Sequence, residues 1–295
     1  MSTEDRTAPV LPAAAEVDPA RRRFLTAAAV AAPTAMLLAA DSAVAAAAPS
    51  PSAAGKAALV TGSSRGIGAA IARRLAQDGY AVTVNYLSSR DQAADVVRDI
   101  TAAGGKAIFE QADVSDPAAV RRLFDRHQAA FGQLDVVVAN AGIQRLGAFA
   151  AMEDDDYQRL IDVNMKGCFH TLRESARRIT DGGRIIALSS GTTLMRPPTY
   201  GPYAASKAAV EVFVNILAKE LAGRGVSVNA VAPGTTNTSL FTDGKTPRQI
   251  AAFAQQTPHK RLGEPEDIAR VVSILAGGQG GWINGQVVNA NGGLV

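Results

Sequence analysis

Short apolar runs alternate with longer segments of helical character from about residue 55 onwards, and this alternation constrains the fold more than any other feature. Runs of this length between turn residues are typical of buried strands. They lie at residues 56–61, 81–85, 106–110, 134–138, 184–188, 226–231 and 286–289. Helical segments are expected after Gly68 to about 78, at 116–131, from about 154, around Tyr203 to about 222, and at 266–276. Strands and helices that alternate in this way predict one α/β domain, with a parallel, doubly wound sheet of about seven strands and helices on both faces.

The composition suits a soluble globular protein and argues against several kinds of site. Of the 295 residues, 47% are hydrophobic and 19% are charged, which is close to the average for such proteins. The net charge of +3 comes from interspersed charges, so nucleic acid is not an expected partner. Cys168 is the only cysteine, which excludes an intrachain disulfide, and the three histidines are scattered. We therefore expect no metal site.

The first 54 residues differ in composition from the rest of the chain. A basic flank at residues 21–23 precedes an uncharged, Ala-rich run at 27–40, which is shorter than the roughly 20 residues needed to span a bilayer. Residues 43–45 offer a small-x-small cleavage site. These three parts together predict an export signal peptide at residues 1–45, followed by a disordered linker at 46–54.

The basic flank carries a more specific pattern. Arg21-Arg22-x-Phe24-Leu25 resembles the twin-arginine (Tat) signal of bacterial exported proteins, with Ala20 where a Ser or Thr usually precedes the pair. It implies the Tat translocase as a partner and a periplasmic or extracellular location. Two alternatives remain open, namely an Ala-rich extension without a signal function and a true start near Gly55. Either would leave the protein in the cytoplasm.

The first predicted strand ends in the glycine-rich turn Thr61-Gly62-Ser63-Ser64-Arg65-Gly66-Ile67-Gly68, and an amphipathic helix follows. Glycines at such a turn let the backbone approach a pyrophosphate, which the helix N-terminus then stabilises. Because the required strand precedes the turn and the required helix follows it, the pattern predicts a dinucleotide site in a Rossmann-type fold.

The end of the second predicted strand, Asn85-Tyr86-Leu87-Ser88-Ser89-Arg90, bears on the choice between NAD and NADP. An acidic residue here would bind the ribose 2′-hydroxyl of NAD, but no carboxylate precedes Asp91. Arg65 in the glycine-rich turn can hold a 2′-phosphate bidentately. NADP(H) is therefore the preferred cofactor, with NAD(H) as the second choice. The alternative interpretation of Arg65 and Arg90 is ordinary solvated charge.

Tyr203 and Lys207 lie four residues apart, so on a helix they project from one face. A free Tyr has a pKa of about 10, and a nearby positive charge lowers it. Lowering that pKa to about 7 takes roughly 4 kcal/mol and would let the phenol exchange a proton with a substrate oxygen. Taken alone, the pair equally describes a surface Tyr beside a surface Lys.

Taken in order, the motifs of residues 55–295 resemble those of the short-chain dehydrogenase/reductase family. The matching marks are the turn at 61–68, Asp113, Asn140-Ala141-Gly142, Asn164, Ser190, the pair Tyr203/Lys207, Pro233-Gly234, and the closing segments 263–269 and 285–293. Ser190 precedes Tyr203 by 13 residues, which is the family interval. Ala139 and Asn291 depart from the usual Asn and Asp. Within the family, the chain looks most like the NADP-preferring, 3-oxoacyl-(acyl carrier protein) reductase-like branch.

The resemblance implies a role for each matching residue. Tyr203 would be the acid/base, and Lys207 would lower its pKa and hold the nicotinamide ribose. Ser190 would polarise the substrate carbonyl, and Asn164, in a distorted helix, would hold a water that links Lys207 to solvent. Asp113 and Val114 would contact adenine, Asn140 the ribose region and Thr238 the carboxamide. The full cofactor-binding set implied is Gly62, Ser64, Arg65, Gly66, Ile67, Gly68, Tyr86, Ser88, Asp113, Val114, Asn140, Ala141, Gly142, Tyr203, Lys207, Pro233, Gly234, Thr236 and Thr238.

These expectations describe an NADP-dependent oxidoreductase that transfers hydride between nicotinamide and a carbonyl or alcohol, with Tyr203 as acid/base. The alternative is a catalytically silent, cofactor-binding regulator, whose mark would be a broken Ser-Tyr-Lys set, whereas here the set is intact. The substrate is not readable from the sequence. Candidate cleft walls are Gln144, Leu146, Thr192, Leu194 and Met195, and residues 236–257, with Phe241 and Phe253, are a candidate lid. The resemblance also implies a homotetramer or homodimer.

Overall fold

Seven strands form one parallel sheet in the computed structural model, which describes residues 53–295. The strands are β1 (Ala57–Val60), β2 (Ala81–Tyr86), β3 (Ala107–Gln111), β4 (Val136–Ala139), β5 (Arg184–Leu188), β6 (Ser227–Pro233) and β7 (Val287–Ala290). Their order across the sheet is β3-β2-β1-β4-β5-β6-β7, and every neighbouring pair is parallel. The predicted doubly wound, Rossmann-type sheet is therefore confirmed.

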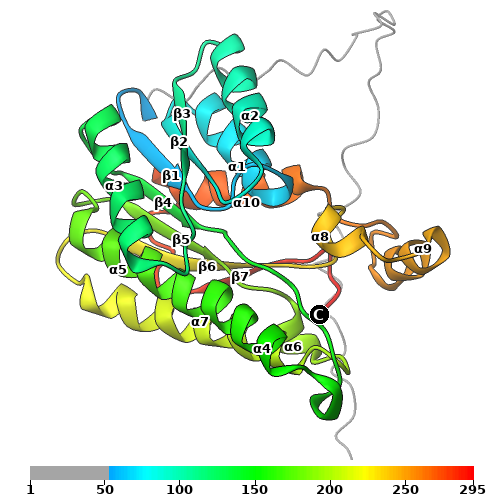
Figure 1. The fold of residues 1–295 in the computed structure, drawn as a ribbon. Helices are drawn as coiled ribbons and strands as arrows, with labels where there is room; N and C mark the ends of the chain where they lie inside the picture. The colour runs from blue at the N-terminus through cyan, green and yellow to red at the C-terminus, as the bar shows by residue number, and fades with distance from the viewer. Residues whose placement is uncertain (1–52) are drawn as a thin grey trace, which may run out of the picture. The chain divides into compact units, whose positions relative to one another are not determined.

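Helices cover both faces of the sheet (Figure 1). One face carries α1 (Gly66–Gln77), α2 (Arg90–Ala102) and α10 (Pro265–Ala276), and the other carries α3 (Pro117–Phe131), α5 (Gly167–Arg178) and α7 (Gly201–Glu220). Successive strand residues alternate between the two cores, so that Val60 packs with the first set of helices and Leu59 with the second. Burial on both faces explains why the strands are almost continuously apolar.

The long helix predicted from residue 154 is interrupted by a wider turn. It comprises α4 (Asp154–Ile161), a π-helical segment η4 (Asp162–Lys166) and α5. Asn164 lies in the π-helical segment, which agrees with the distorted helix that the sequence implied. Single π-helical turns are rare and occur mostly at functional sites.

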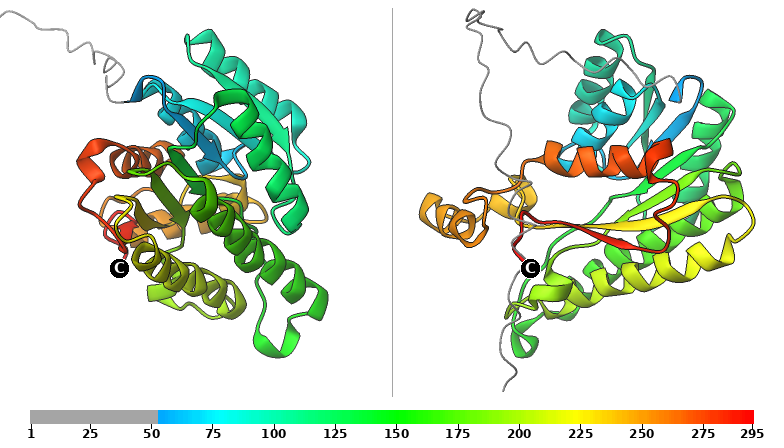
Figure 2. Two further views of the ribbon diagram at one scale, coloured as in Figure 1. Left: turned by 90° about the vertical axis from the view of Figure 1, so that its left-hand side faces the viewer. Right: turned by 180° about the vertical axis from the view of Figure 1, so that it is seen from behind.

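Short helices gather around one end of the sheet, beyond the ends of β4, β5 and β6. They are η3 (Phe149–Ala151), α6 (Thr192–Met195), α8 (Ser239–Thr242) and α9 (Pro247–Gln256), while η5 (Gly278–Gly280) follows α10. Figures 1 and 2 show that α8 and α9 project beyond the sheet. The segment expected to be a lid is thus mostly helical, and Phe241 and Phe253 pack edge to face with ring centroids 5.2 Å apart.

The predicted signal peptide at 1–45, and all of the predicted linker except residues 53 and 54, lie outside the described residues. The sheet and its helices belong to one compact unit. Between residues 53 and 295, no helix combines the length and the apolar character that a membrane span requires.

Candidate active site

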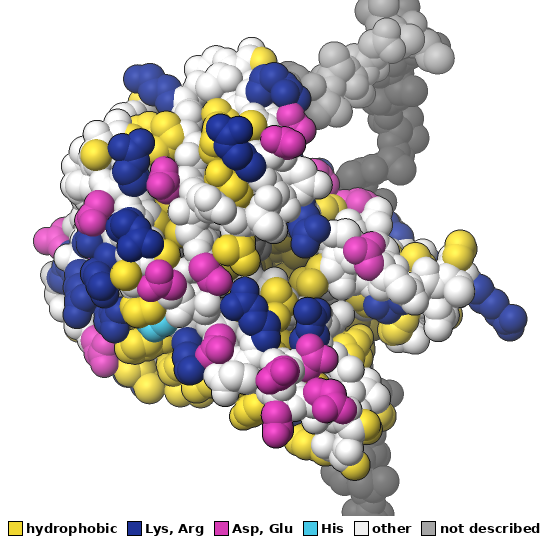
Figure 3. Space-filling view, viewed as in Figure 1, with side chains coloured by type: hydrophobic (Ala, Val, Ile, Leu, Met, Phe, Trp, Pro, Cys, Tyr) yellow, Lys and Arg dark blue, Asp and Glu magenta, His cyan; other side chains and the backbone are white. Residues whose placement is uncertain are grey.

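A cleft of about 370 Å³ opens where the parallel strands end, which is where ligands bind in sheets of this kind. Its walls are the glycine-rich turn, the end of β2, the segment after β3, the segment after β4 and the start of α7. Figure 3 shows the hollow in the middle of this face, with hydrophobic side chains inside it and Lys and Arg side chains around its edge.

Most of the residues predicted to hold a cofactor line this cleft. They are Gly62, Ser64, Arg65, Gly66, Ile67, Gly68, Tyr86, Ser88, Asp113, Val114, Asn140, Ala141, Gly142, Tyr203, Lys207 and Thr238. Pro233 lies at the buried end of β6 and is not part of the lining. Gly234 and Thr236 instead line a second cavity of about 300 Å³. Asn164 and Ser190 lie next to the lining and bond to residues around it.

The glycine-rich turn packs tightly against the segment after β4. A Cβ on Gly62 would lie 2.8 Å from the Ala141 Cα, and a Cβ on Gly68 would lie 2.5 Å from Asn140 Nδ2. Asn140 Nδ2 donates to the carbonyl oxygens of Thr61 and Gly62, both at 2.9 Å. No side chain caps the first turn of α1, so its N–H groups face the cleft without a side-chain partner. This is the arrangement that binds a pyrophosphate.

Asn85, at the end of β2, joins three parts of this wall and was not among the predicted site residues. Its Oδ1 accepts from Gly62 N at 3.0 Å, and its Nδ2 donates to the carbonyls of Glu110 at 3.3 Å and Ala112 at 3.1 Å. The side chain is buried and lines the cleft. The one feature of the sequence that could have indicated this role is the amide side chain of Asn85 at the end of an otherwise apolar run.

The end of β2 suits a 2′-phosphate better than a 2′-hydroxyl. Arg65, Ser88 and Ser89 line the cleft there and offer hydrogen-bond donors. The other arginine of this region, Arg90, places its guanidinium over the Phe109 ring at 5.6 Å and is not part of the lining. Arg65 is therefore the basic residue on this wall that can reach the ligand.

Asp113 is the one carboxylate in the described lining of the cleft, and it is already engaged. It accepts from the Ser115 hydroxyl at 2.6 Å and the Ser115 N–H at 2.8 Å, and it pairs with Arg159 Nη2 at 3.4 Å. Burial raises the pKa of Asp113, but the hydrogen bonds from Ser115 and Arg159 outweigh it and hold that pKa below its usual value. Arg159, which was not predicted, thus lies beside Asp113 in the lining of the cleft.

Tyr203 is buried near the start of α7, with 7% of its surface exposed. Burial raises the pKa of its phenol to about 12, while a hydrogen bond with the Ser190 side chain acts in the opposite direction. The Tyr200 ring meets the Tyr203 ring edge to face at 6.2 Å. Ser190 Oγ accepts from Thr192 Oγ1 at 3.0 Å, which leaves the Ser190 hydroxyl proton to be donated to Tyr203 or to a ligand.

Lys207 lines the cleft from α7. Its Nζ donates to the Leu188 carbonyl at 2.8 Å, and burial lowers the pKa of Lys207 to about 8. Burial is the largest influence on the pKa values of both groups and favours the uncharged form of each. The expected effect of Lys207 on the Tyr203 pKa stays a prediction.

Asn164 fastens the segment after β4 to α7. Its Oδ1 accepts from Ile143 N at 2.8 Å, and its Nδ2 donates to Ile143 O at 2.9 Å and to Ser206 Oγ at 3.3 Å. These bonds occupy the side chain, and the water-holding role expected of its backbone stays a prediction.

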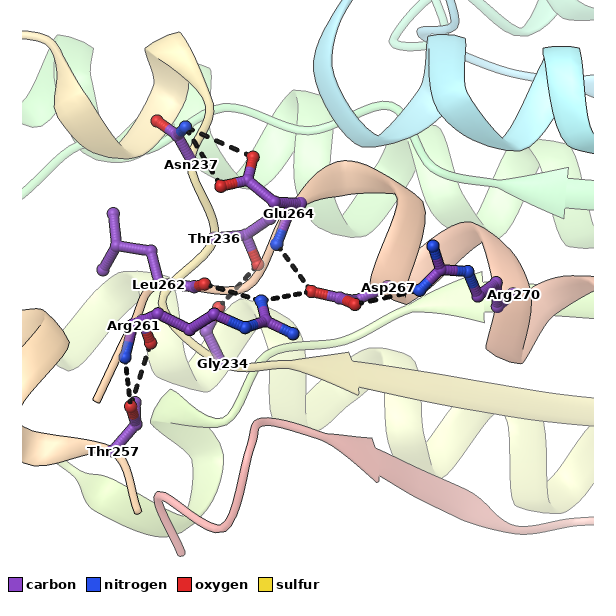
Figure 4. A network of polar contacts seen from close by, with 9 residues as sticks. All are labelled: Gly234, Thr236, Asn237, Thr257, Arg261, Leu262, Glu264, Asp267 and Arg270. Atoms are coloured by element: carbon purple, nitrogen blue, oxygen red, sulfur yellow. Dashed lines mark hydrogen bonds and ion pairs between the residues drawn. The ribbon is translucent and has the colours of Figure 1, made fainter. Parts of the chain in front are cut away.

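The loop after β6 is held by a polar network (Figure 4). Thr236 Oγ1 donates to Gly234 O at 3.0 Å, and Asn237 Nδ2 donates to the Glu264 carboxylate at 3.2 Å. The main chain pairs with the following segment, where Gly263 N donates to Thr235 O at 2.9 Å. Gly234 and Thr236 thus support the loop that carries Thr238 to the cleft.

Several further residues line the cleft without having been predicted as cofactor or catalytic residues. They are Asn85, Leu87, Ser89, Ala112, Ile143, Arg159, Val163, Leu188, Ser189, Ser239 and Leu240. Ser189, which the sequence interval set aside in favour of Ser190, donates to Glu211 Oε1 at 2.5 Å. Most of the others are apolar or follow a strand directly. Only the predicted site residues next to them in the sequence could have indicated that they line the cleft.

In the described part of the chain, no group of three or more His, Cys, Asp or Glu side chains could hold a metal ion. Cys168 is buried, and burial raises the pKa of its thiol to about 12.

A glycine-rich turn before an uncapped helix, facing a buried Tyr and Lys across one cleft, defines a nucleotide-dependent oxidoreductase of the α/β class. Residues 62–295 match the family model described as enoyl-(acyl carrier protein) reductase. The chain is 43% identical over 256 residues to an NADPH-dependent aldehyde reductase-like chloroplast protein of Arabidopsis thaliana, covering 82% of this chain and 95% of the relative. It is 43% identical over 251 residues to a versicolorin reductase of Emericella nidulans, covering 81% and 95% respectively.

Solved structures agree with this. A short-chain dehydrogenase from Burkholderia cenocepacia in complex with NADP is 40% identical, with a TM-score of 0.78 over 82% of this chain and 99% of that one. The chain belongs to the short-chain dehydrogenase/reductase family.

Proposed function

We propose that the protein is an NADP(H)-dependent oxidoreductase that interconverts a carbonyl compound and an alcohol. The observation that carries this is the buried Tyr203, hydrogen-bonded to Ser190, at the edge of a cleft whose other walls fit a dinucleotide. The cofactor supplies the hydride when it is bound. The bound NADP of the Burkholderia cenocepacia relative supports NADP as the cofactor, as do Arg65, Ser88 and Ser89 in this chain.

The chain's own residues would bind the cofactor, orient the substrate and supply a proton to the carbonyl oxygen. The uncapped start of α1 would hold the pyrophosphate, Arg65 the 2′-phosphate, and Asp113 with Val114 the adenine. Because burial raises the Tyr203 pKa to about 12, its Oη keeps a proton at neutral pH and can donate it to a carbonyl oxygen. Ser190 would direct that oxygen toward Tyr203, and Asn164 would keep the Ile143 segment in place beside them.

The alternative of a catalytically silent regulator is not favoured. The relatives of this chain are named as reductases and dehydrogenases, and its Ser190, Tyr203 and Lys207 set is intact. A catalytic role therefore accounts both for the residues of the site and for the names of the relatives.

The test is the variant Tyr203→Phe, which removes one hydroxyl. We expect kcat/KM for carbonyl reduction to fall by about 10² to 10⁴, the usual contribution of a general acid, while NADPH binding stays within a few-fold of wild type. Tyr200→Phe is the matched control, since it removes one hydroxyl from the ring that packs edge to face against Tyr203, and it should retain most of the activity. Undiminished turnover in Tyr203→Phe would contradict the proposed mechanism.

A finer assignment to the 3-oxoacyl-(acyl carrier protein) reductase-like branch rests on the sequence motifs and on the acyl-carrier description of the matched family model. Turnover of a short 3-oxoacyl thioester with NADPH, compared with a simple ketone of equal length, tests this assignment. A clear preference for the ketone would contradict it.

We also propose that the protein assembles as a homotetramer or homodimer. Large apolar side chains are exposed on α5 and α7, where Phe169 is 45%, Val212 is 55% and Ile216 is 48% exposed, and near the C-terminus, where Trp282 is 99% exposed. Exposed apolar area of this kind is typical of contact surfaces. Light scattering of the purified protein tests the proposal, and a monomeric mass would refute it.

Export through the Tat translocase remains a proposal that rests on the sequence of residues 1–45 alone. Cell fractionation with N-terminal sequencing of the mature protein tests it. A cytoplasmic protein with an intact N-terminus would refute it.

A further inference from the structure

Four large apolar side chains are exposed at the open side of the candidate active site. Leu146 is 41%, Phe149 is 84%, Leu194 is 55% and Leu240 is 49% exposed. They come from the segment between β4 and α4, from α6 and from α8. We call these four residues the rim. Apolar groups that are left exposed together commonly mark a surface that another molecule covers.

Three of the rim residues are linked to the surroundings of Tyr203. Leu240 lines the cleft directly. Leu194 lies in α6, which begins at Thr192, the residue that donates to Ser190 Oγ. Phe149 lies against the start of α7, because a Cβ on Gly201 would come within 2.6 Å of its Cζ.

Main-chain bonding keeps these segments together. Gly147 N donates to Thr199 O at 3.0 Å and joins the segment after β4 to the loop that leads into α7. Figure 1 shows α6 and the preceding segment on one side of the opening, and α8 with α9 on the other. A molecule whose carbonyl reaches Tyr203 would therefore leave the rest of its body between the rim residues.

The charged side chains near the rim are engaged elsewhere. Arg145 pairs with Asp156 at 2.9 Å. The Lys245 ammonium lies 4.5 Å from the centroid of the Phe241 ring. Arg196 donates through Nε to the Thr193 carbonyl oxygen at 3.3 Å. The opening thus offers more apolar area than ionic partners.

We infer that the rim binds the apolar body of the substrate, and that the substrate is an uncharged ketone or aldehyde with an extended hydrocarbon or aromatic body. The inference rests on the proposed function, since it assigns the substrate class of the same site. Phe149 supplies a ring face or edge for such a body, and each methylene that the rim covers should tighten transition-state binding by about two- to fourfold.

The first experiment measures kcat/KM of the full-length protein with NADPH for 2-butanone, 2-hexanone and 2-octanone. It includes 4-oxopentanoate, in which a carboxylate replaces the terminal ethyl group of 2-hexanone. We expect a rise of about two- to fourfold per methylene, and a value for 4-oxopentanoate at least tenfold below that for 2-hexanone. A flat series, or a preference for the carboxylate, would overturn the inference and leave the proposed function intact.

The second experiment repeats the series with Phe149→Ala and Leu194→Ala. Each variant should lower kcat/KM for 2-octanone by about tenfold and leave that for 2-butanone within about twofold. Ile274→Ala is the matched control, since Ile274 is a large apolar residue on α10 that is 50% exposed and is not one of the rim residues. It should follow the wild-type series.

Four further outcomes are informative. An unchanged chain-length series in Phe149→Ala would overturn the inference, and so would an equal loss in Ile274→Ala. A Phe149→Ala protein with an altered molar mass and an unaltered series would place the ring in a contact between copies and also overturn it. If the wild-type protein binds NADPH but reduces no ketone or aldehyde, the proposed function fails, and this inference fails with it.

Discussion

Burial is the dominant influence on the two ionisable side chains at the centre of the site. It raises the pKa of Tyr203 to about 12 and lowers that of Lys207 to about 8. Tyr203 therefore stays protonated across the ordinary working range of pH. Lys207 is the group of this pair that changes charge near neutrality.

The pH dependence of catalysis should report on Lys207. As pH rises through about 8, the ammonium loses its proton and with it the charge that would hold the cofactor. We expect kcat/KM for NADPH, which reflects ionisations of the free enzyme, to fall about tenfold per pH unit above that value. In Lys207→Arg the decline should disappear from this range, because Arg stays charged. A wild-type profile that is flat between pH 7 and 9.5 would contradict the assignment.

Arg65 should determine the preference for NADP over NAD. Loss of a charged hydrogen bond costs about 1.5–3 kcal/mol, so Arg65→Ala should raise KM for NADPH by roughly 10- to 100-fold and change KM for NADH little. Arg90→Ala provides a matched control, since Arg90 packs over Phe109 outside the cleft lining. Equal losses in the two variants, or a wild-type preference for NADH, would show that Arg65 has no special role.

At the scale of single residues, the sequence predicted those side chains whose spacing is set by local geometry. The glycine-rich turn and the pair Tyr203 and Lys207 are of this kind, and both line the cleft. Asn85 and Arg159 were missed because their roles depend on partners far away in the chain, namely Gly62 and Asp113. The Lys207 bond to Leu188 O was missed for the same reason.

At the scale of elements, the seven strands were predicted to within a few residues, since each is a short run between turn residues and the five central ones, β2, β1, β4, β5 and β6, are buried on both faces. The helical nature of residues 239–256 was not predicted. These short helices have no buried residues, and the apolar periodicity by which a helix is recognised is therefore weak there. The segment is held by local bonds instead, such as the capping box between Thr246 and Gln249.

The start of α1 tolerates no side chain at Gly68. A Cβ there would lie 2.5 Å from both Asn140 Nδ2 and Gly62 O, and overpacking of this kind costs about 1–3 kcal/mol. We expect Gly68→Ala to lower the urea midpoint and to weaken NADPH binding at least tenfold. Gly278→Ala is the matched control, because no atom lies within 4 Å of its added Cβ, and its effect should stay below about 0.5 kcal/mol. If both variants bind NADPH like wild type, the close approach has no functional importance.

At the scale of the whole molecule, one buried histidine couples the fold to pH. His127 of α3 is 1% exposed and bonds to Thr83 Oγ1 at 2.8 Å and to Gln133 O at 3.0 Å. Burial lowers its pKa from 6.5 to about 4. The folded protein therefore keeps this ring neutral at pH values where the unfolded chain would protonate it.

The free energy of unfolding should fall as the pH drops from 6.5 towards 4, because the unfolded chain binds more protons in that window. The loss at pH 5 relative to pH 7 should be about 1–2 kcal/mol, measured by urea unfolding. His127→Gln should show a smaller difference between the two pH values. The pKa values of Asp113 and Asp267 are lowered from 3.8 in the folded protein. Their effect on the free energy of unfolding therefore changes at pH values below this window. Equal wild-type stability at pH 5 and pH 7 would contradict the role of His127.

The packing of α10 against α1 has a consequence for how the protein is made. Strands β3, β2, β1 and β4 are complete once residue 139 has been synthesised, and the turns that follow β1 and β2 line the cleft. One flank of α1, however, is covered only by a helix that begins at residue 265. A chain still attached to the ribosome thus carries a nearly finished nucleotide-binding half with an uncovered apolar surface. That surface is covered only after α10 has been made and has packed against α1.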